Sequence, residues 1–473
     1  MTYLQSLQYL ESFINYEKIP AYPYKESLKL ERIKGFLDTI NNPQDHLKCI
    51  HVAGTKGKGS TCAFIAYILR EAGYRVGLYT SPHLSDFRER IRILSPRSPV
   101  PSPRLSYFEG MILKKELADL VGRLRPAIEK YNKNSKYGPL TFFEVYTSLA
   151  FVYFKEENVD FLVLETGLGG RLDATSVVNP LACVITPISY EHTQKLGHTL
   201  REIATEKAGI IKVPQRLSTP APQPIVISAP QEREPGEVIR DKCKKTGIKL
   251  YEVGKDIKFR VSATKRGGGA NFFGGHSVQQ FTVHSLTGRY TNLKIRLLGR
   301  HQLTNATAAV GIIEALRSYN TNIDIDSIRG GLYNTVWPGR CEVMARNPLV
   351  VLDGAQNIAS ARVLKEAIKD NFKYKRLILV LGISSDKDIL GICLELCPLA
   401  DGIVLTRANN PRAADVNGIE SSIAYFPLSI IGSKNVREAI KIAKGITSKR
   451  DLILVTGSLY VVGEARKYVR LFF

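Results

Sequence analysis

A glycine-rich segment with two lysines and a serine, GTKGKGS at Gly54–Ser60, is the part of the sequence best suited to bind phosphate. It lies between a β-branched run, KCIHVAG, and an apolar-periodic segment that ends at Gly73, which predicts strand, turn and helix. Glycines let backbone N–H groups converge on phosphate oxygens, and the start of a helix adds partial positive charge. Lys58 would reach the β- and γ-phosphates of ATP, and the Ser60 hydroxyl would bind Mg²⁺. The loop is shorter than the usual Walker pattern and Gly59 separates the lysine from the serine, so an ordinary glycine-rich turn is the alternative.

Three further polar side chains follow predicted strands. Glu165 ends the apolar run VDFLVLE, Ser81 follows RVGLYT, and His192 follows PLACVIT after a short loop. Ligands of open α/β sheets bind at the carboxyl edge of the strands, and Mg²⁺ prefers hard oxygen ligands. Each residue also has a structural alternative. Glu165 could form a surface ion pair, and Ser81, which precedes a proline, could belong to a turn. His192 could have a purely structural role in its loop. Glu165 is therefore the candidate Mg²⁺ ligand that the pattern supports by itself.

Alternating strands and helices must position these groups. Buried strand patterns at 48–54, 75–80, 159–166 and 180–186 are interrupted by helical patterns, which predicts a parallel sheet covered on both faces. From about residue 246 to 299 the helical signal disappears, and alternation around glycines predicts a small antiparallel sheet. The α/β rhythm then returns. We therefore predict an α/β protein with a P-loop-type, mostly parallel N-terminal domain over 1–299, which includes the β-rich part at 246–299, and a Rossmann-like α/β domain over 300–473.

Composition narrows the function classes. The chain of 473 residues has no apolar run of the about 18 residues that a membrane span needs, and its first twenty residues have no signal-peptide pattern, so we expect a cytoplasmic protein without membrane contact. Its 66 Lys and Arg against 44 Asp and Glu give a net charge of +22. These residues are spread along the chain, which favours a basic enzyme with anionic substrates over a nucleic-acid-binding protein. Only Cys393 and Cys397 lie close together among the seven cysteines, so neither a zinc site nor a disulfide scaffold is expected.

Eight motifs carry a resemblance to a known family. They are HVAGTKGKGST, TSPHLSDFRERIRI, ETGLGGRLDAT, EHTQKLG, EKAGIIK, GRHQLTNA, WPGRCE and DGAQN, in this order between about Leu28 and Gly463. The chain thereby resembles folylpolyglutamate synthase and dihydrofolate synthase, of the Mur ligase superfamily. The resemblance implies an ATP-dependent ligase in which a carboxylate attacks the γ-phosphorus and the amine of L-glutamate displaces phosphate from the acyl phosphate. It further implies folate or dihydropteroate as acceptor, one or two Mg²⁺ ions, and a monomer.

The resemblance also assigns roles to single residues. The implied metal residues are Ser60, Ser81, Glu165, His192 and Lys207, the last as a carbamate. The implied catalytic residues are Lys58, Lys207, His192 and Arg340. The implied ATP-binding residues are Gly54, Thr55, Lys56, Gly57, Lys58, Gly59, Ser60, Asn305, Arg340 and Asp353. The implied pteroate or folate residues are Leu30, Glu31, Arg32, Thr141, Phe142, Phe143, Glu144, Leu172, Asp173 and Ala174.

Several of these assignments have alternatives. From the pattern alone, Phe142 and Phe143 are core residues of an amphipathic helix, and Lys207 is a helix lysine paired with Glu202 or Glu206. Arg88 and Arg90, in the loop SPHLSDFRER, would meet substrate carboxylates.

The chain also departs from the family text. Glu191 stands where the family has aspartate before His192, and its extra methylene keeps the charge but moves the carboxylate. Gln356 and Ile358 stand in DGAQNI where the family has DGAHNP, and glutamine cannot ionise. The Pro-rich segment 95–106 would lie near the substrate loop.

Two other function classes stay open. One is a Mur-type ligase for a different acceptor, such as a peptidoglycan or cyanophycin precursor. The other is a non-enzymatic basic protein that binds phosphate or nucleic acid. Within the leading hypothesis, the sequence does not distinguish dihydropteroate from tetrahydrofolate.

Overall fold

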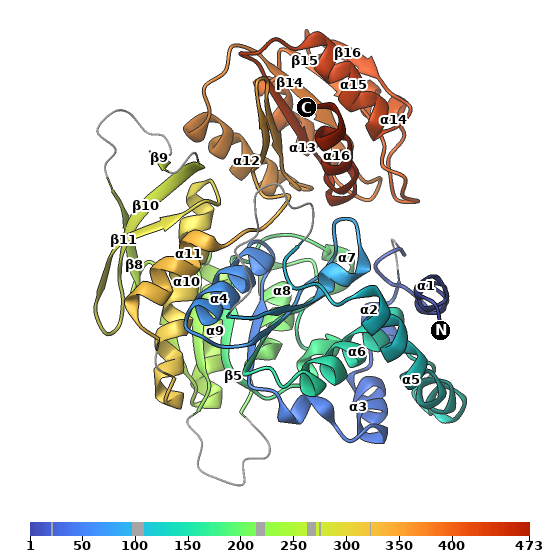
Figure 1. Cartoon of the computed structure of the whole chain (residues 1–473), viewed down its shortest axis with the longest axis vertical. Helices are drawn as coiled ribbons and strands as arrows, with labels where there is room; N and C mark the ends of the chain where they lie inside the picture. Colours follow the sequence, from blue (N-terminus) through green and yellow to red (C-terminus); the bar gives the residue numbers. More distant parts are fainter. Residues whose placement is uncertain (20–21, 97–107, 214–222, 263–270, 274–275, 322) are drawn as a thin grey trace.

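Two α/β units are stacked on each other, with a small antiparallel sheet at the side of the first (Figure 1). The computed structural model describes residues 1–19, 22–96, 108–213, 223–262, 271–273, 276–321 and 323–473. Most of the Pro-rich segment 95–106, which was predicted to lie near the substrate loop, is outside the described residues.

The first unit is built on a seven-stranded sheet in the order β3-β2-β4-β1-β5-β6-β7, in which only β3 runs antiparallel to its neighbour. Mostly apolar, buried runs such as CIHVA and FLVLE form its central strands because both faces of the sheet are covered. The strands are β1 (Cys49–Ala53), β2 (Val76–Tyr79), β3 (Ile91–Leu94), β4 (Phe161–Glu165), β5 (Pro180–Ile185), β6 (Ile225–Ser228) and β7 (Lys249–Glu252).

Helices cover both faces of this sheet. One face packs against α3, α5, α6, α8 and α9, and the other against α4 together with two later helices. The helices before residue 247 are α1 (Tyr3–Glu11), α2 (Tyr24–Ser27), α3 (Leu30–Thr39), α4 (Lys58–Glu71), α5 (Lys114–Asn134), α6 (Phe142–Glu156), α7 (Thr193–Leu196), α8 (Leu200–Lys207) and α9 (Arg233–Thr246).

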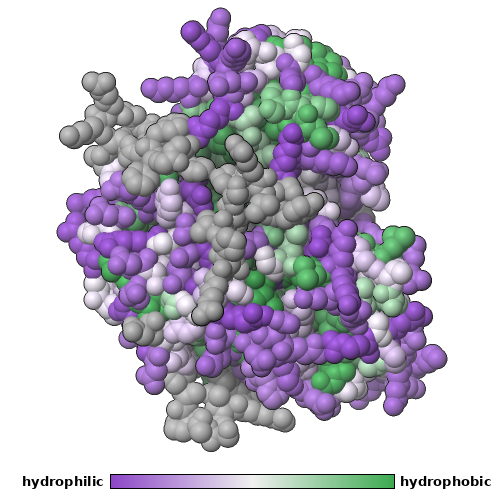
Figure 2. Space-filling model, in the orientation of Figure 1, coloured by the Kyte–Doolittle hydropathy of each residue, from purple (hydrophilic) through white to green (hydrophobic). Residues whose placement is uncertain are grey.

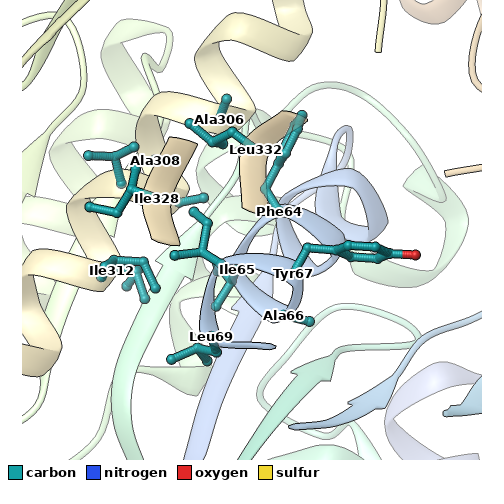
Figure 3. Packing of buried hydrophobic residues seen from close by; sticks show 14 of the residues in the cluster. Phe64, Ile65, Ala66, Tyr67, Leu69, Ala306, Ala308, Ile312, Ile328 and Leu332 are labelled. Atoms are coloured by element: carbon teal, nitrogen blue, oxygen red, sulfur yellow. The ribbon is translucent and has the colours of Figure 1, made fainter. Parts of the chain in front are cut away.

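The two later helices, α10 (Arg300–Ala315) and α11 (Ile325–Asn334), belong to the first unit. In Figure 3 their apolar side chains, among them Ile312 and Leu332, pack against Phe64 and Ile65 of α4. The predicted boundary at residue 300 is therefore about forty residues too early, because the second sheet begins only with β12 at Glu342. An apolar helix pattern predicts burial but does not say which sheet the helix covers.

The small antiparallel sheet confirms the expectation for the glycine-rich region. It has the order β11-β10-β8, with β9 paired to β10, and its inner face adds Phe281, Val283 and Leu293 to the core around α4 and α10. The predicted range began too early, since β7 joins the large sheet instead. The strands are β8 (Lys258–Val261), β9 (Asn271–Phe273), β10 (His276–His284) and β11 (Arg289–Ile295).

The second unit is a six-stranded sheet in the order β12-β13-β17-β14-β15-β16, parallel except for β12. Helices cover both of its faces. Its strands are β12 (Glu342–Arg346), β13 (Leu349–Leu352), β14 (Leu377–Leu381), β15 (Gly402–Leu405), β16 (Ser429–Gly432) and β17 (Leu452–Thr456). Its helices are α12 (Ile358–Asn371), α13 (Ile389–Leu396), α14 (Val416–Ile423), α15 (Val436–Ile446) and α16 (Leu459–Phe472).

The surface is mostly polar, and the cysteines are buried. Hydrophilic residues cover most of the face in Figure 2, where apolar residues form separate groups. Within the described ranges, no helix combines the length and the apolar character that crossing a bilayer requires. All seven cysteines lie in these ranges as buried thiols without a disulfide.

Candidate active site

Four neighbouring strands of the first sheet end at one edge and carry the polar groups found in the sequence. The strands β2, β4, β1 and β5 lie side by side and run parallel. Ser81 follows β2, Glu165 ends β4, the loop at Gly54 follows β1, and His192 follows β5 through a short loop. The edge is the one at which ligands of open α/β sheets bind, so the sheet order brings together the groups that the sequence separates.

The glycine-rich loop has a backbone that only glycine adopts easily. Gly54 and Gly57 have φ of +142° and +85°, and a Cβ at Gly54 would lie 1.9 Å from Oγ1 of Thr186. The N–H groups of Thr55 and Lys56 donate to the carbonyl of Pro187 at 3.0 and 3.2 Å, which fixes the loop against the segment after β5. The loop thereby leads into the N-terminus of α4, a position that fits a phosphate group.

Lys58, Glu165 and Ser81 form the polar group in front of this loop. Lys58 Nζ lies 4.0 Å from Oε1 of Glu165, and the backbone N–H of Ser81 donates to Oε2 of Glu165 at 3.2 Å. Burial raises the pKa of the Glu165 carboxyl, and the charge of Lys58 opposes this shift. A buried carboxylate beside one cation and one N–H group can accept a further cation, as the proposed magnesium role requires.

Three of the candidate metal ligands, Ser60, Ser81 and Glu165, offer the oxygen atoms that Mg²⁺ prefers. His192 lines the same cavity as Ser81, and burial lowers the pKa of His192 to about 3, so its imidazole is neutral and has a free lone pair. Among the residues that the structure describes, no three His, Cys, Asp or Glu side chains gather into a metal-binding group. Mg²⁺ does not need such a group, because it usually keeps several waters and binds substrate phosphates in addition to one or two carboxylates. The roles of Ser60, Ser81, Glu165, His192 and Lys207 as metal residues stay predictions.

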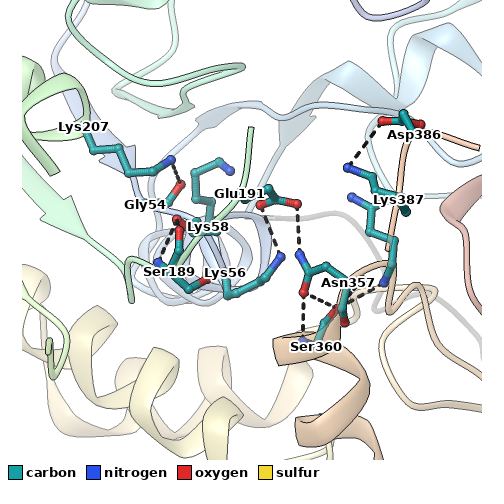
Figure 4. A network of polar contacts seen from close by, with 12 residues as sticks. Gly54, Lys56, Lys58, Ser189, Glu191, Lys207, Asn357, Ser360, Asp386 and Lys387 are labelled. Carbon is teal, nitrogen blue, oxygen red and sulfur yellow. Dashed lines mark hydrogen bonds and ion pairs between the residues drawn. The ribbon is translucent and has the colours of Figure 1, made fainter. Parts of the chain in front are cut away.

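Lys207, at the end of α8, is a buried lysine directed at the phosphate loop. Its Nζ donates to the carbonyl of Gly54 at 2.8 Å (Figure 4), and 4% of the residue is exposed. Burial and the neighbouring charge of Lys58 lower the pKa of Lys207 to about 7. The ion pair considered from the sequence is not found: Glu206 pairs with Arg171 at 2.7 Å, and Glu202 accepts the N–H of Thr199. A neutral amine is what carbamylation requires.

Glu191 connects the two α/β units, which the sequence did not predict. Its carboxylate pairs with Lys56 at 3.2 Å and accepts a hydrogen bond from the side chain of Asn357 at 3.0 Å, as Figure 4 shows. Burial alone would raise the pKa of Glu191, but Lys56 and other cations nearby hold it well below its ordinary value. The carboxylate at this position therefore contacts both the phosphate loop and the second unit.

The second unit and α10 bring the remaining nucleotide candidates to the loop. Asn305 packs on Gly57, where a Cβ would lie 2.4 Å from its Oδ1, and Arg340 shares a small pocket with Gly59, Ser81 and Glu165. Both carboxylate oxygens of Asp353 accept backbone N–H groups, those of Cys341 at 2.8 Å and of Ala355 at 2.9 Å, and burial raises its pKa. The positions are compatible with the predicted nucleotide contacts, which stay predictions.

A cavity of about 490 Å³ extends from this edge between the two units. Its wall includes apolar, aromatic and acidic groups and also the cations Lys195, Lys387 and Arg412 with Asp386. The predicted pteroate residues on its wall are Thr141, Phe143, Glu144, Leu172, Asp173 and Ala174. It adjoins the small pocket of Arg340 and Glu165, because Ser81, Pro82 and Leu459 line both.

Four of the predicted substrate residues are not on the described wall of this cavity. Phe142 is fully buried and packs with Phe87 and Tyr146, so its predicted substrate contact is wrong, whereas the next residue of the helix faces the cavity. Leu30 packs against the core and Glu31 points to solvent. Arg32 donates to both carboxylate oxygens of Glu144 at 3.0 and 2.8 Å, so it positions this cavity residue from behind.

Arg88 and Arg90 were predicted to meet substrate carboxylates, and the structure gives both a carboxylate of the protein instead. Arg88 pairs with Asp86 at 2.7 Å, and the buried Arg90 pairs with Glu17 at 2.6 Å. The backbone carbonyl of Glu17 also accepts a hydrogen bond from Arg412 at 3.0 Å. The N-terminal segment around Glu17 is thereby fixed between the two units.

Sequence reasoning missed several residues of the cavity wall. Tyr16, Glu17 and Tyr22 come from an N-terminal segment without periodicity, so no pattern marked them. Lys387 and Arg412 follow the carboxyl ends of β14 and β15. Because ligands bind at such ends, a search of the loops after the second set of strands would have found these two cations.

Trp337 fixes the start of α4 from the connection between the units. Its ring lies where a side chain at Gly59 would be, since a Cβ there would come within 2.8 Å of Trp337 Cζ2. Phe108 contacts the ring edge-on at a centroid distance of 5.7 Å, and the Arg92 guanidinium lies 5.9 Å from it, so the indole is held in place. The extra glycine in the phosphate loop is therefore required by packing.

We expect Gly59→Ala to destabilise the protein by about 1–3 kcal/mol, because the new methyl group overpacks against the indole. Trp337→Phe removes the clashing atoms, so the double variant should regain part of the lost Tm. Its KM for ATP should likewise lie closer to the wild-type value than that of the single variant. Gly445→Ala in α15 is the control, since a Cβ there meets nothing within 4 Å. Thermal unfolding checks the prediction, and an equal loss of Tm in the single and double variants would contradict it.

Comparisons with known proteins agree with this arrangement. Residues 117–313 match the Mur ligase middle domain, and residues 339–459 match the Mur ligase glutamate ligase domain. The chain is 33% identical over 448 residues to a dihydrofolate synthase/folylpolyglutamate synthase of Bacillus subtilis, covering 93% of this chain and 95% of the relative.

Solved structures of relatives have the same fold over the whole chain. Mycobacterium tuberculosis folylpolyglutamate synthase complexed with ADP gives a TM-score of 0.83 at 30% identity, covering 99% of this chain and 98% of that one. Escherichia coli FolC in complex with DHPP and ADP gives a TM-score of 0.80 at 27% identity, covering 100% and 98%. The chain therefore belongs to the folylpolyglutamate synthase/dihydrofolate synthase family and is an ATP-dependent ligase of the Mur type.

Proposed function

We propose that this protein uses ATP to join L-glutamate to the carboxylate of a folate, of 7,8-dihydropteroate, or of both. The observation that carries the proposal is that the phosphate loop and a large cavity meet at one edge of the first sheet, where Ser81 lines both pockets. An acceptor bound in the cavity would have its carboxylate next to the γ-phosphate of ATP. Family membership supports the same reaction.

The residues around the cavity suit this acceptor. Phe143 offers an aromatic face to a flat heterocycle, while Asp173 and Glu144 offer carboxylates to its N–H groups. Burial raises the pKa of Asp173, and its oxygens accept N–H groups of Leu168 and Thr175 at 2.8 and 3.0 Å, so its orientation is fixed. The cations Lys195, Lys387 and Arg412 on the same wall would hold the carboxylates of glutamate.

The loop Gly54–Ser60 would hold the triphosphate, with Lys58 and Arg340 neutralising its charge as it increases during transfer. Ser60, Ser81, Glu165 and His192, with carbamylated Lys207, would hold one or two Mg²⁺ ions, which would supply charge stabilisation at the phosphates. Closure of the two units around the substrates would exclude water, which protects an acyl phosphate from hydrolysis. A cytoplasmic monomer is part of this proposal.

The test uses purified protein with ATP, Mg²⁺ and glutamate, and offers dihydropteroate and tetrahydrofolate in separate reactions. We expect a glutamylated product by mass spectrometry with at least one acceptor, and ADP release that needs both acceptor and glutamate. The pattern of products decides between dihydrofolate synthase, folylpolyglutamate synthase and a bifunctional enzyme. No product with either acceptor, or ATP hydrolysis stimulated by RNA or DNA instead, would overturn the proposal.

A further inference from the structure

One largely buried carboxylate, that of Glu191, connects the phosphate loop with the second α/β unit. Oε2 of Glu191 lies 3.2 Å from Nζ of Lys56, a residue of the loop, and Oε1 accepts from Nδ2 of Asn357 at 3.0 Å. Asn357 lies just before α12 and follows β13, so it belongs to the second unit. Figure 4 shows the glutamate between the lysine and the asparagine, with a contact on each side.

The orientation of the Asn357 amide is fixed by a second contact. Its Oδ1 accepts the backbone N–H of Ser360 at 2.9 Å and thereby caps α12. With the oxygen directed at the helix, only the NH₂ group can face Glu191. The interaction is therefore specific for a donor at residue 357 and an acceptor at residue 191.

The surroundings make this contact strong. The Glu191 side chain is 11% exposed and that of Lys56 is 27% exposed, so water screens the pair weakly. The backbone of Lys56 is at the same time fixed by its hydrogen bond to the Pro187 carbonyl. A displacement of the second unit would therefore break a partly buried hydrogen bond to a charged group, which is costly.

We propose that Glu191 is a positioning residue that sets the second unit against the phosphate loop, so that Arg340 and Asp353 reach ATP bound on Gly54–Ser60. Glutamate is long enough to contact Lys56 and Asn357 at once, and aspartate at this position is one methylene shorter. The role of the side chain is thus to align two halves of one site, and it takes no part in the chemistry. The inference rests on the proposed function.

Asn357→Asp tests the contact with almost no change of shape. Aspartate caps helices as well as asparagine does, so α12 keeps its first turn. The group that faces Glu191, however, changes from a donor to a negatively charged acceptor. We expect the kcat/KM for ATP to fall about tenfold or more, which is within the range of coupling between residues in contact.

Glu191→Gln supplies the reciprocal change. In the double variant, the new amide at residue 191 can donate to the new carboxylate at residue 357 while its oxygen still faces Lys56. We therefore expect the double variant to have a higher kcat/KM for ATP than either single variant. Asn435→Asp is the matched control, because Asn435 caps α15 in the same way, away from the interface, and should keep wild-type kcat/KM.

The inference is overturned if Asn357→Asp lowers the kcat/KM for ATP by the same factor whether residue 191 is glutamate or glutamine. A purely structural effect of the variants would lower Tm and would not be rescued reciprocally. Binding of the non-hydrolysable analogue AMPPCP, measured by calorimetry, gives a second readout that should follow the same rescue pattern. Wild-type protein without ligase activity would refute the proposed function, whereas active wild-type protein without this coupling refutes only the present inference.

Discussion

Glu165→Gln is expected to lower kcat about 10²- to 10³-fold while the protein stays folded. The glutamine has the same shape and keeps an acceptor for the N–H of Ser81, but it removes the negative charge that lies 4.0 Å from Lys58 and that Mg²⁺ would need. The loss should fall mainly on kcat and on the Mg²⁺ concentration at half-maximal rate. Steady-state kinetics over a magnesium titration measure both.

The stability of this variant separates a chemical effect from misfolding. Because burial raises the pKa of Glu165, its ionised form is disfavoured in the folded protein, and the folded state loses stability as this carboxyl ionises at rising pH. A neutral glutamine removes that cost, so the Tm of the variant without ligands should equal or exceed that of the wild type at pH 7. The rise of Tm on adding Mg²⁺ and ATP should be smaller in the variant.

Glu314→Gln is the matched control for Glu165→Gln. Glu314 is 5% exposed, against 4% for Glu165, and accepts hydrogen bonds from Thr287 and Tyr290 at the small antiparallel sheet. Loss of the Glu314 carboxylate should lower Tm and leave kcat unchanged. A Glu165→Gln enzyme with wild-type kcat and magnesium dependence would contradict the placement of the metal at this edge.

Lys207→Ala should also cost about 10²- to 10³-fold in kcat, because the substitution removes the group that lies 2.8 Å from the Gly54 carbonyl. If the lysine reacts with CO₂, its neutral amine forms an N–C bond and releases a proton, which gives an anionic oxygen ligand in place of a cation. A short carboxylate such as acetate would occupy the space left by the alanine variant and supply the missing anionic oxygens. We therefore expect acetate or formate to restore part of the activity.

Lys212→Ala is the control for this experiment. Lys212 lies on the same segment, burial lowers its pKa to about 8, and its Nζ donates to the Ser176 carbonyl instead of the phosphate loop. Its alanine variant should show no response to acetate. Full activity of Lys207→Ala would contradict a role for this lysine, and a strong loss without rescue by short acids would contradict the carbamate.

The sequence was sufficient to locate site residues where a local structural pattern and the chemistry of the side chains coincide. The loop Gly54–Ser60 and Glu165 could be found because a buried strand, a glycine turn and a helix follow each other, and this order fixes the edge of the sheet at which they lie. Which strands are neighbours depends on long-range pairing. The proximity of Ser81 to Glu165 was therefore expected from the family resemblance and could not be derived from their spacing in the sequence.

The predictions were wrong where the direction of a side chain changes from one residue to the next, or where the packing partner of a helix decides the unit to which it belongs. Phe142 and Phe143 are adjacent at the start of α6, so one faces the core and the other the cavity, and an aromatic pair in sequence does not reveal which. The helix at Arg300 was assigned to the wrong unit because its apolar face fits either sheet. Glu17 and Arg412, which are 395 residues apart, meet only in the folded chain.

The most direct test of the central claim follows oxygen from the acceptor to phosphate. Dihydropteroate or tetrahydrofolate labelled with ¹⁸O in its free carboxylate is incubated with the enzyme, ATP, Mg²⁺ and glutamate, and the products are weighed by mass spectrometry. If the carboxylate attacks the γ-phosphorus, each glutamylated product should be matched by one inorganic phosphate that carries one ¹⁸O, together with ADP. Glutamylated product accompanied by unlabelled phosphate, or by AMP and pyrophosphate, would contradict the account.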